Sequence, residues 1–572
     1  MKPIALTALA IVTTLAHGLP TTAVANEAVG AYLAARQASI DNDYRAAAKY
    51  FTRALAGDPS NPAILESSVV AYVSLGEMER AIPIARKIEK AGLKSQIAFM
   101  VLMTDEVKRG DHDAVLSRLK AGHGIGSLAD GLISAWSELG KGDVVAAMAR
   151  FDKVAGEKGL RSFAIYHKAL ALASVGDFEA AAAIFAGKSD GPMQRTRRGT
   201  IAWAQILSQL ERNDEAVALI DDTFGTDLDA EIQRLRDRLA AGERVPFDLV
   251  SNAGDGVAEV FYSLGQALRS DTSADYVLLY ARLAQYLNPT HFDAAILAAE
   301  LLDSLGRHDL AIAAYKSVPR GHPAHVRAEI GRAEALRQAG KSDAAVEVLG
   351  QLARSNPDLP AVHVAAGDLF RDMERYAEAA AAYDRAIALY EKRGVDQWFV
   401  HYVRGICHER LGQWDQAEAD FRHALKLNPD QPQVLNYLGY SLVDKGRKLD
   451  EALTMIKRAV AARPDDGYIV DSLGWALYRL GRFDEAVGHM ERAAELMPTD
   501  AVVNDHLGDV LWKVGRRVEA RFQWQRALSL IDKDNPSPDI DPERIRRKLK
   551  EGLDAVLDQE GASGTEVVND RG

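Results

Sequence analysis

Asp471–Pro498 reads DSLGWALYRLGRFDEAVGHMERAAELMP, and this stretch decides the fold. A glycine lies in its first half, Gly481 marks a turn, and Ala486 comes early in the second half. A glycine suits the left-handed residue that ends a helix, and a proline stops the next helix, so the stretch predicts two helices joined by a turn. The same order recurs in Val403–Pro429 (VRGICHERLGQWDQAEADFRHALKLNP) and Asn504–Leu530 (NDHLGDVLWKVGRRVEARFQWQRALSL).

The alanine early in each second helix sets the register of a repeat that extends along most of the chain. Successive gaps are mostly 34 residues, with occasional gaps of 35 or 38. A degenerate unit surrounds Gly110–His112, and Val277 replaces the alanine of another unit, which makes about fourteen units. The register alanines are Ala47, Ala81, Ala147, Ala181, Ala216, Ala311, Ala345, Ala379, Ala417, Ala452, Ala486 and Ala520.

This pattern resembles the tetratricopeptide repeat (TPR) family, in which small residues let paired helices approach closely and bulky residues fill the gaps between pairs. The resemblance implies an all-α fold, a right-handed superhelical α-solenoid. No single pair buries its apolar face, so we expect each pair to be stabilised by its neighbours.

The main interruption of the repeat lies between Ala216 and Val277 and contains a charged helical stretch, DAEIQRLRDRLAAGE, and a smaller irregularity of four extra residues lies at Leu389–Gln397. We therefore expect two repeat blocks, residues 26–224 and 251–533, with a helical joint at 225–250. The alternative is one divergent repeat that keeps the stack continuous. Whether the two blocks stack continuously is left open by the sequence.

The C-terminal region departs from the repeat. Three prolines indicate a stiff linker at the start of residues 534–558, and Glu543–Leu557 has the apolar spacing of an amphipathic helix. We expect this helix to cap the open end of the solenoid. Its basic residues could alternatively meet an acidic partner or lipid head groups: Arg546, Arg547, Lys548 and Lys550. Residues 559–572 have the composition of a disordered tail.

The N-terminus has the features of a secretory signal peptide, residues 1–25. Lys2 is followed by the largely apolar stretch Ile4–Ala16 and then by a small-x-small pattern ending at Ala25. We expect cleavage after Ala25, a periplasmic mature chain and no transmembrane segment in it. The alternative is an uncleaved N-terminal anchor.

Composition and motifs argue against several kinds of function. The net charge of −12 does not suit nucleic-acid binding, which needs a basic surface, and the single cysteine excludes an intrachain disulfide. His401, Cys407 and His408 share a predicted helix, but no third ligand lies at metal spacing, so a packing or groove role is expected. The acidic stretch Asp532–Glu543 lacks the central glycine of a Ca²⁺ loop. We predict no enzyme activity, no cofactor and no metal site.

The inner surface of such a solenoid is the expected binding surface, because the first helix of each pair lines it. Aromatic residues there supply contact area, and Asn or Asp side chains can pair with an extended peptide backbone. Some of the aromatic side chains could instead pack between adjacent first helices. The candidate groove residues are Phe399, Tyr402, Glu409, Asn436, Tyr440, Asp471, Trp475, Tyr478, Asp505, Asp509 and Trp512.

Asn436–Leu528 resembles more specifically a family of large envelope TPR proteins of proteobacteria, one type of which is an outer-membrane lipoprotein adaptor for a periplasmic carboxyl-terminal processing protease. The resemblance implies a scaffold or adaptor that presents protein substrates to such a protease. That adaptor type has a lipidated cysteine, whereas the only cysteine here is Cys407. The alternative function is an assembly factor for envelope polysaccharide or outer-membrane machinery. An enzyme with an unrecognised site and a self-assembling structural protein are further classes, and the oligomeric state stays open.

Overall fold

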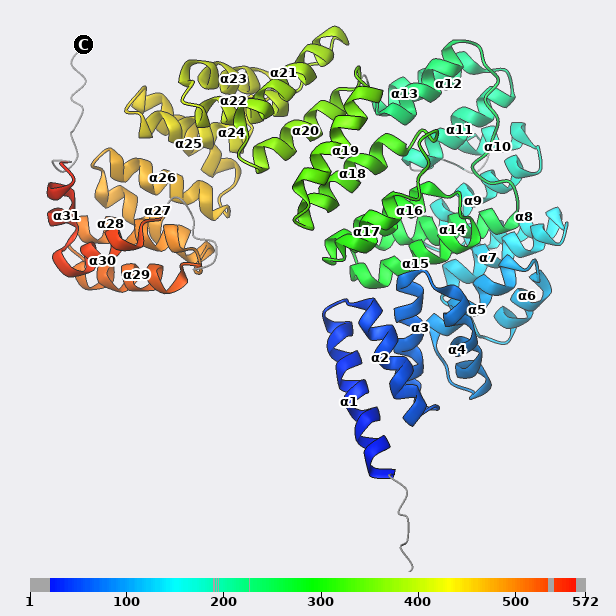
Figure 1. The fold of residues 1–572 in the computed structure, drawn as a ribbon. Coiled ribbons are helices and arrows are strands. Elements are labelled where there is room, and N and C mark those ends of the chain that lie inside the picture. The colour runs from blue at the N-terminus through cyan, green and yellow to red at the C-terminus, as the bar shows by residue number, and fades with distance from the viewer. Residues whose placement is uncertain are drawn as a thin grey trace, which may run out of the picture. The chain divides into compact units, whose positions relative to one another are not determined.

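The computed structural model describes residues 21–188, 191, 193, 195–225, 227–532 and 540–561 of the chain, with side chains from residue 27 onward. Residues 1–20 of the expected signal peptide, 534–539 of the expected linker and 562–572 of the expected tail lie outside the described residues. The described residues form helices and turns without a strand, so the all-α solenoid expectation is confirmed (Figure 1). None of the helices within these residues has the length and apolar character needed to cross a membrane.

The chain divides into two compact units, Met1–Pro357 and Asp358–Gly572. The first unit contains α1 to α19. Their bounds are α1 Thr21–Ile40, α2 Tyr44–Gly57, α3 Pro62–Leu75, α4 Met78–Lys90, α5 Gln96–Lys108, α6 His112–Lys120, α7 Ser127–Gly140, α8 Val144–Ala155, α9 Arg161–Ser174, α10 Phe178–Phe185, α11 Arg197–Gln209, α12 Asn213–Phe224, α13 Ala230–Ala240, α14 Ala253–Leu268, α15 Ala274–Leu287, α16 Phe292–Ser304, α17 His308–Tyr315, α18 His325–Gln338 and α19 Ser342–Ser355.

The second unit contains the remaining helices, which continue the helix pairs from α20–α21 to α28–α29 and add two more. Their bounds are α20 Pro360–Asp372, α21 Tyr376–Lys392, α22 Trp398–Arg410, α23 Trp414–Leu427, α24 Pro432–Asp444, α25 Leu449–Ala462, α26 Gly467–Arg479, α27 Phe483–Leu496, α28 Ala501–Lys513, α29 Arg517–Leu530, α30 Pro542–Glu551 and α31 Leu553–Gln559.

The register residues explain why these helices pair. Every register alanine is at most 1% exposed, and each lies on the second helix of a pair, where a larger side chain would separate the two helices. The degenerate unit around Gly110–His112 has Val115 at the same position, and Val115 and Val277 are both fully buried. The expected turn glycines have positive φ, which L-residues with a side chain rarely adopt: Gly76, Gly176, Gly306, Gly412, Gly481 and Gly515.

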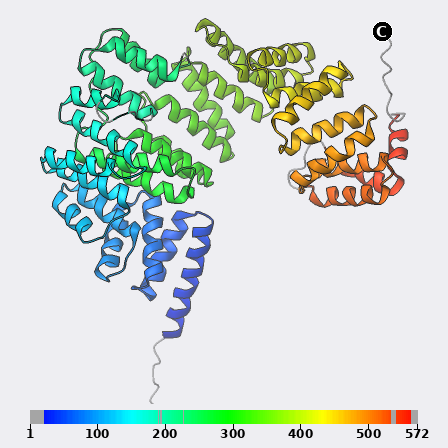
Figure 2. The same cartoon turned by 180° about the vertical axis from the view of Figure 1, so that it is seen from behind.

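Helices α14 and α15 cover the first helices of earlier pairs in the first unit. They pack against α3, α5, α7 and α9, which precede them by more than 75 residues (Figure 1; Figure 2 from behind). Arg282 of α15 donates from Nε to the carbonyl of Ser74 at 3.1 Å, and Lys108 donates from Nζ to the carbonyl of Leu287 at 2.9 Å. Two segments far apart in sequence therefore form one core.

The expected joint at 225–250 lies inside the first unit. Its helix α13 packs against α12 and buries Ile232 and Leu239, each 1% exposed. Asp229 caps α13 by accepting hydrogen bonds from its first backbone N–H groups. The boundary between the two compact units lies at Pro357 and Asp358, where the repeat spacing is regular and the sequence predicts no interruption.

The C-terminal segment forms two helices where the sequence predicts one over Glu543–Leu557. Gly552 has a φ of +91° and separates α30 from α31, so the apolar stripe turns at that residue. Helix α30 packs against α29, and Ile545, Leu553 and Val556 are fully buried.

Candidate partner-binding groove

The groove is built by the first helices of consecutive pairs in the second unit, α24, α26 and α28. Each begins after an extended residue: Gln431 before α24, and Asp466 and Asp500 before α26 and α28. Both aspartates accept a hydrogen bond from a backbone N–H of the helix that follows, which satisfies one of its free donors. On the far side of α24, a Cβ at Gly439 would lie 2.7 Å from the Ile456 side chain, so glycine permits the close pairing with α25.

A cavity of about 920 Å³ lies along these helices. Five of the eleven sequence-predicted residues line it, namely Glu409, Asn436, Tyr440, Asp471 and Trp475. The structure adds a wall from the chain that follows α29. The added lining residues are Arg410, Tyr437, Ser441, Asp444, Tyr468, Ser472, Thr499, Asp500, Ala501, Val502, Val503, His506, Leu530, Ile531, Asp532 and Ile540.

An aromatic stack contributes two residues, Trp475 and His506, to the lining of the groove, and its third member, Tyr478, is buried. The ring of Trp475 stacks on Tyr478 at 4.7 Å between centroids and on His506 at 3.9 Å. His506 Nδ1 lies 3.1 Å from an Asp471 carboxylate oxygen. Burial lowers the pKa of His506, but the combined attraction of Asp471, Asp505 and Asp509 outweighs burial, so the pKa is raised above its ordinary value. The stack is a rigid surface of apolar area with a charged edge.

Asn436 supplies the hydrogen-bonding groups of the groove wall. Its Nδ2 donates to Ser472 Oγ at 3.1 Å, and Ser472 in turn donates to the carbonyl of Tyr468 at 2.9 Å. These bonds hold the orientation of the amide. Asn436 Oδ1 is buried and has no hydrogen-bond partner among the described residues. A buried acceptor without a donor costs free energy, about 1–3 kcal/mol.

The wall of the groove is acidic. Five carboxylate side chains line it against one arginine and one histidine. Several of these carboxylates also contact cations of the chain: Asp444 lies 3.2 Å from Arg479, and Glu409 lies 3.7 Å from Lys445. The excess of carboxylates favours a cationic ligand.

Two predicted residues on α22 lie outside the cavity. Phe399 is 41% exposed and has an edge contact with Trp398. Tyr402 packs against Phe421 and against Tyr437 of the next first helix, at 6.1 and 6.0 Å between ring centroids. Tyr402 therefore takes the alternative role of packing between adjacent first helices.

Four predicted residues, Tyr478, Asp505, Asp509 and Trp512, lie beneath or behind the groove. The C-terminal helices account for the last three: Lys548 Nζ of α30 donates to Asp505 at 2.6 Å and to Asp509 at 2.7 Å. Trp512 Nε1 donates to Asp554 of α31 at 2.9 Å. The inner face of the last pair is thus covered by the chain itself.

The sequence reasoning missed His506, Tyr468 and the chain after α29. His506 occupies the repeat position of Tyr437 and Ser472, which also line the cavity, so the repeat register could have found it. The return of Leu530–Asp532 to the groove has no sequence signal, because it depends on where the last helix ends in space.

Comparisons with known proteins identify repeats of one kind. A model described as tetratricopeptide repeat matches residues 32–92 and 330–394, and one described as the middle TPR-like domain of cilia and flagella-associated protein 70 matches residues 370–514. A TPR repeat-containing protein of Pseudomonas aeruginosa is 38% identical over 81 residues, which are 14% of this chain and 14% of that protein.

Three solved structures are similar over long stretches. Yeast Tom70 has a TM-score of 0.35 and 15% identity, covering 94% of this chain and 96% of its own. The APC/C hetero-tetramer Cut9–Hcn1 has a TM-score of 0.38 and 15% identity, covering 93% and 98%. A tetratricopeptide repeat protein from Parabacteroides merdae has a TM-score of 0.36 and 16% identity, covering 45% and 97%.

Proposed function

We propose that this chain, which contains tetratricopeptide repeats, is a non-enzymatic scaffold or adaptor that captures an extended segment of a partner protein in the groove of α24, α26 and α28. The observation that supports this most directly is the cavity of about 920 Å³, which Asn436, Asp471 and Trp475 line together. Asn and Asp side chains can pair with the backbone of an extended peptide without demanding a particular sequence.

The chemistry of the groove favours a segment with basic and aromatic or apolar side chains. Trp475 and His506, which line the cavity and stack on each other, offer aromatic surface to an apolar side chain or a guanidinium group. The surrounding carboxylates attract Lys and Arg and disfavour an acidic segment. We therefore expect a partner whose bound segment carries net positive charge.

The proposed location is the periplasm, after cleavage following Ala25. Lys2, the apolar stretch Ile4–Ala16 and the small residues before the cleavage position support export. Sequencing the N-terminus of the chain released by osmotic shock should give Asn26 first. A full-length chain that starts at Met1 and stays with the cytoplasmic fraction would contradict this proposal.

The proposed partner is a periplasmic processing protease together with its substrates. The support is the family resemblance over Asn436–Leu528, which includes the central groove residues Asn436, Asp471 and Trp475. Assembly machinery for envelope polysaccharide or outer-membrane proteins is the other outcome that partner identification can give.

The test is site-specific photo-crosslinking. A photoreactive phenylalanine analogue at Tyr440, inside the groove, should crosslink to a partner in intact cells. Asn436→Ala combined with Trp475→Ala should abolish the crosslink, whereas Phe522→Ala is the matched control, because Phe522 is 61% exposed on α29 outside the groove. Mass spectrometry of the crosslinked partner separates a protease from assembly machinery.

A peptide measurement makes the test quantitative. Labelled peptides of matched length with net positive or net negative charge are titrated against the full chain. Positive peptides should bind more tightly, and Asn436→Ala alone should weaken them by about 1 kcal/mol, or roughly fivefold. Equal affinity of the full chain and the double variant for every peptide would rule out this groove as the binding site.

A further inference from the structure

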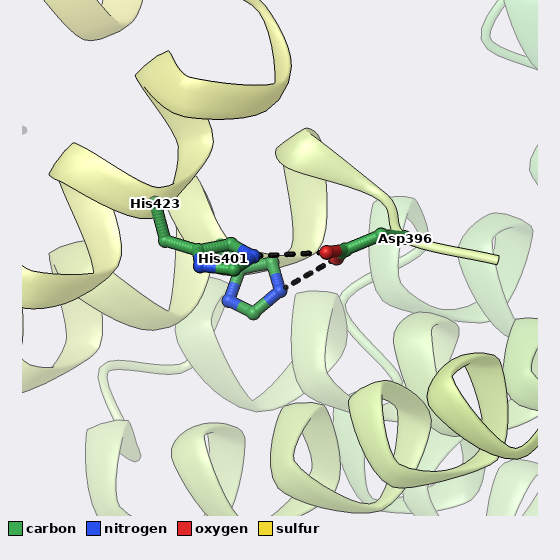
Figure 3. Close-up of side chains that lie close together, drawn as sticks. All are labelled: Asp396, His401 and His423. Carbon is green, nitrogen blue, oxygen red and sulfur yellow. Dashed lines mark hydrogen bonds and ion pairs between the residues drawn. The ribbon is translucent and has the colours of Figure 1, made fainter. Parts of the chain in front are cut away.

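Two histidines and one aspartate from separate parts of the second unit converge beside α22 (Figure 3). Asp396 lies in the turn between α21 and α22, His401 on the first turns of α22, and His423 on α23. His401 Nε2 lies 3.1 Å from Asp396 Oδ1, and His423 Nε2 lies 2.9 Å from Asp396 Oδ2. The three ligand-type atoms all lie within 4.8 Å of one another.

We propose that Asp396, His401 and His423 bind a divalent transition-metal ion, for which Zn²⁺ is the best chemical match. Zn²⁺ takes imidazole nitrogen at about 2.0–2.1 Å and carboxylate oxygen at about 2.0–2.2 Å, so tetrahedral ligands are about 3.4 Å apart. His401 and His423 each contact a different oxygen of Asp396, Oδ1 and Oδ2, so both imidazole nitrogens already face the same carboxylate. Two histidines and a carboxylate are a known zinc ligand set that leaves the fourth position open.

The environment of His401 provides a second, independent argument. Its Nδ1 is buried without a hydrogen-bond partner among the described residues, and Asp420 Oδ1 lies 3.5 Å away. In a neutral ring, the hydrogen bond from Nε2 to Asp396 requires the proton to be on Nε2. Nδ1 is then left without a hydrogen-bond donor. With a metal ion on Nε2, the proton moves to Nδ1 and points toward Asp420. A carboxylate behind a metal-binding histidine is the usual arrangement in zinc sites.

The three side chains differ in burial, so one side of the site is fixed in the helix pair and the other is open to solvent. The His401 side chain is 7% exposed and is fixed within the helix pair, whereas Asp396 and His423 are 40% and 38% exposed. Asp420 is itself held by Arg404, whose Nε donates to it at 2.9 Å. A metal ion can therefore enter from solvent and would tie the turn before α22 to α23.

The cluster could instead be held together by hydrogen bonds alone, and metal titration distinguishes the two cases. The full chain is purified without a polyhistidine tag and stripped with a chelator, which is then removed. Co²⁺ titration should produce visible absorption of a tetrahedral site, and Zn²⁺ should displace Co²⁺ at one ion per chain. Calorimetry should show saturable binding of Zn²⁺ at one ion per chain.

Variants locate the site. His423→Gln and Asp396→Asn should each abolish the Co²⁺ absorption and weaken Zn²⁺ binding at least tenfold. The matched control is His489→Gln, a half-buried single histidine on α27, which should bind as the unmodified chain does. Asp420→Asn should weaken binding by roughly 10–100-fold while keeping the Co²⁺ spectrum, as expected for a residue that only orients His401. Circular dichroism confirms that each variant is folded.

Two results would overturn the proposal. One is a full chain that shows no saturable Zn²⁺ binding by calorimetry. The other is Zn²⁺ binding that His423→Gln and Asp396→Asn leave unchanged, which would place the ion elsewhere on the chain. Either result leaves the proposed peptide groove untouched, because none of the three residues lines it.

Discussion

The two units are built from the same helix pair, yet they differ in what occupies the surface lined by first helices. In the first unit the part of that surface formed by α3, α5, α7 and α9 is covered by α14 and α15. In the second unit the described residues leave a cavity along α24, α26 and α28, and α30 and α31 cover the inner face of the last pair. A repeat therefore does not by itself provide a binding surface; the surface stays available only where the chain does not fold back onto it.

Buried hydrogen bonds join α14 to the helices that it covers in the first unit. Glu259 of α14 is 1% exposed and accepts hydrogen bonds from Tyr166 Oη at 2.8 Å and from Arg198 Nη2 at 2.7 Å. Trp136 Nε1 donates to His167 Nδ1 at 3.2 Å, which leaves the His167 Nε2–H for Ser263 of α14. Burial lowers the pKa of His167 to about 4, so the ring is neutral at pH 7 and this tautomer is retained.

Acid should have the largest effect and should act mainly on the first unit. Burial raises the pKa of Glu259 and of Asp293, but the combined attraction of the neighbouring cations, with Arg198 first among them, outweighs it and holds both pKa values well below their usual range. Their stabilisation is therefore complete above about pH 5, is lost as the pH falls, and decreases markedly below about pH 4. Hydrogen exchange, corrected for intrinsic rates, should show protection lost in residues 27–357 before 358–561.

Asp505 of the second unit should respond in the opposite direction. Burial is the main cause that raises its pKa, with repulsion from Asp509 added, although Lys548 opposes both. A carboxyl group whose folded pKa is raised favours the folded state more as the pH falls. Simultaneous loss of protection in both units on acidification would contradict this contrast.

Glu259→Gln should destabilise the first unit by about 3–5 kcal/mol, because it leaves the Arg198 guanidinium and His291 without their buried carboxylate partner. Urea unfolding followed by exchange mass spectrometry should assign the loss to residues 27–357. Glu215→Gln is the control: Glu215 pairs with Arg212 on the surface and should show no measurable change.

Lys548→Met should destabilise the C-terminal cap by about 3 kcal/mol, because two buried carboxylates lose their shared cation. Exchange in α30 and α31 should accelerate, while α14 and α15 are unaffected. Adding Asp505→Asn and Asp509→Asn should recover part of the loss, since the remaining side chains are neutral. A cap that stays fully protected in Lys548→Met would show that apolar packing alone holds it.

Gly256→Ala should have a smaller effect, about 1–3 kcal/mol, confined to the first unit. A Cβ at this position of α14 would lie 2.2 Å from the buried ring of Trp136 on α7, so the two helices would have to separate. Thermal unfolding and Trp136 fluorescence measure the change. Gly488→Ala is the control, because a Cβ at Gly488 of α27 meets no atom within 4 Å.

The candidate site was only partly predictable, and the reasons are specific. Asn436, Tyr440 and Trp475 were found because the repeat register assigns each residue of a first helix to a face. Asp505, Asp509 and Trp512 occupy equivalent faces, but α30 and α31 return to cover them, and a contact across some 40 residues has no local signature. A search for ligands close in sequence did not find Asp396 and His423, because 26 residues, including the whole of α22, lie between them.

By itself, the sequence determined the helix pairs, their register and their turns. Each helix pair requires a small buried residue where its two helices meet and a glycine with positive φ at its turn, as at Ala486 and Gly481. These requirements are local, so the same residues recur from repeat to repeat. Three features were decided only by the tertiary structure. Helices α14 and α15 pack on the inner surface of the first unit, Lys548 of α30 pairs with Asp509 on the inner face of the last helix pair, and Asp396 lies beside two histidines. These contacts depend on summed small rotations between successive pairs, and no single repeat encodes that sum.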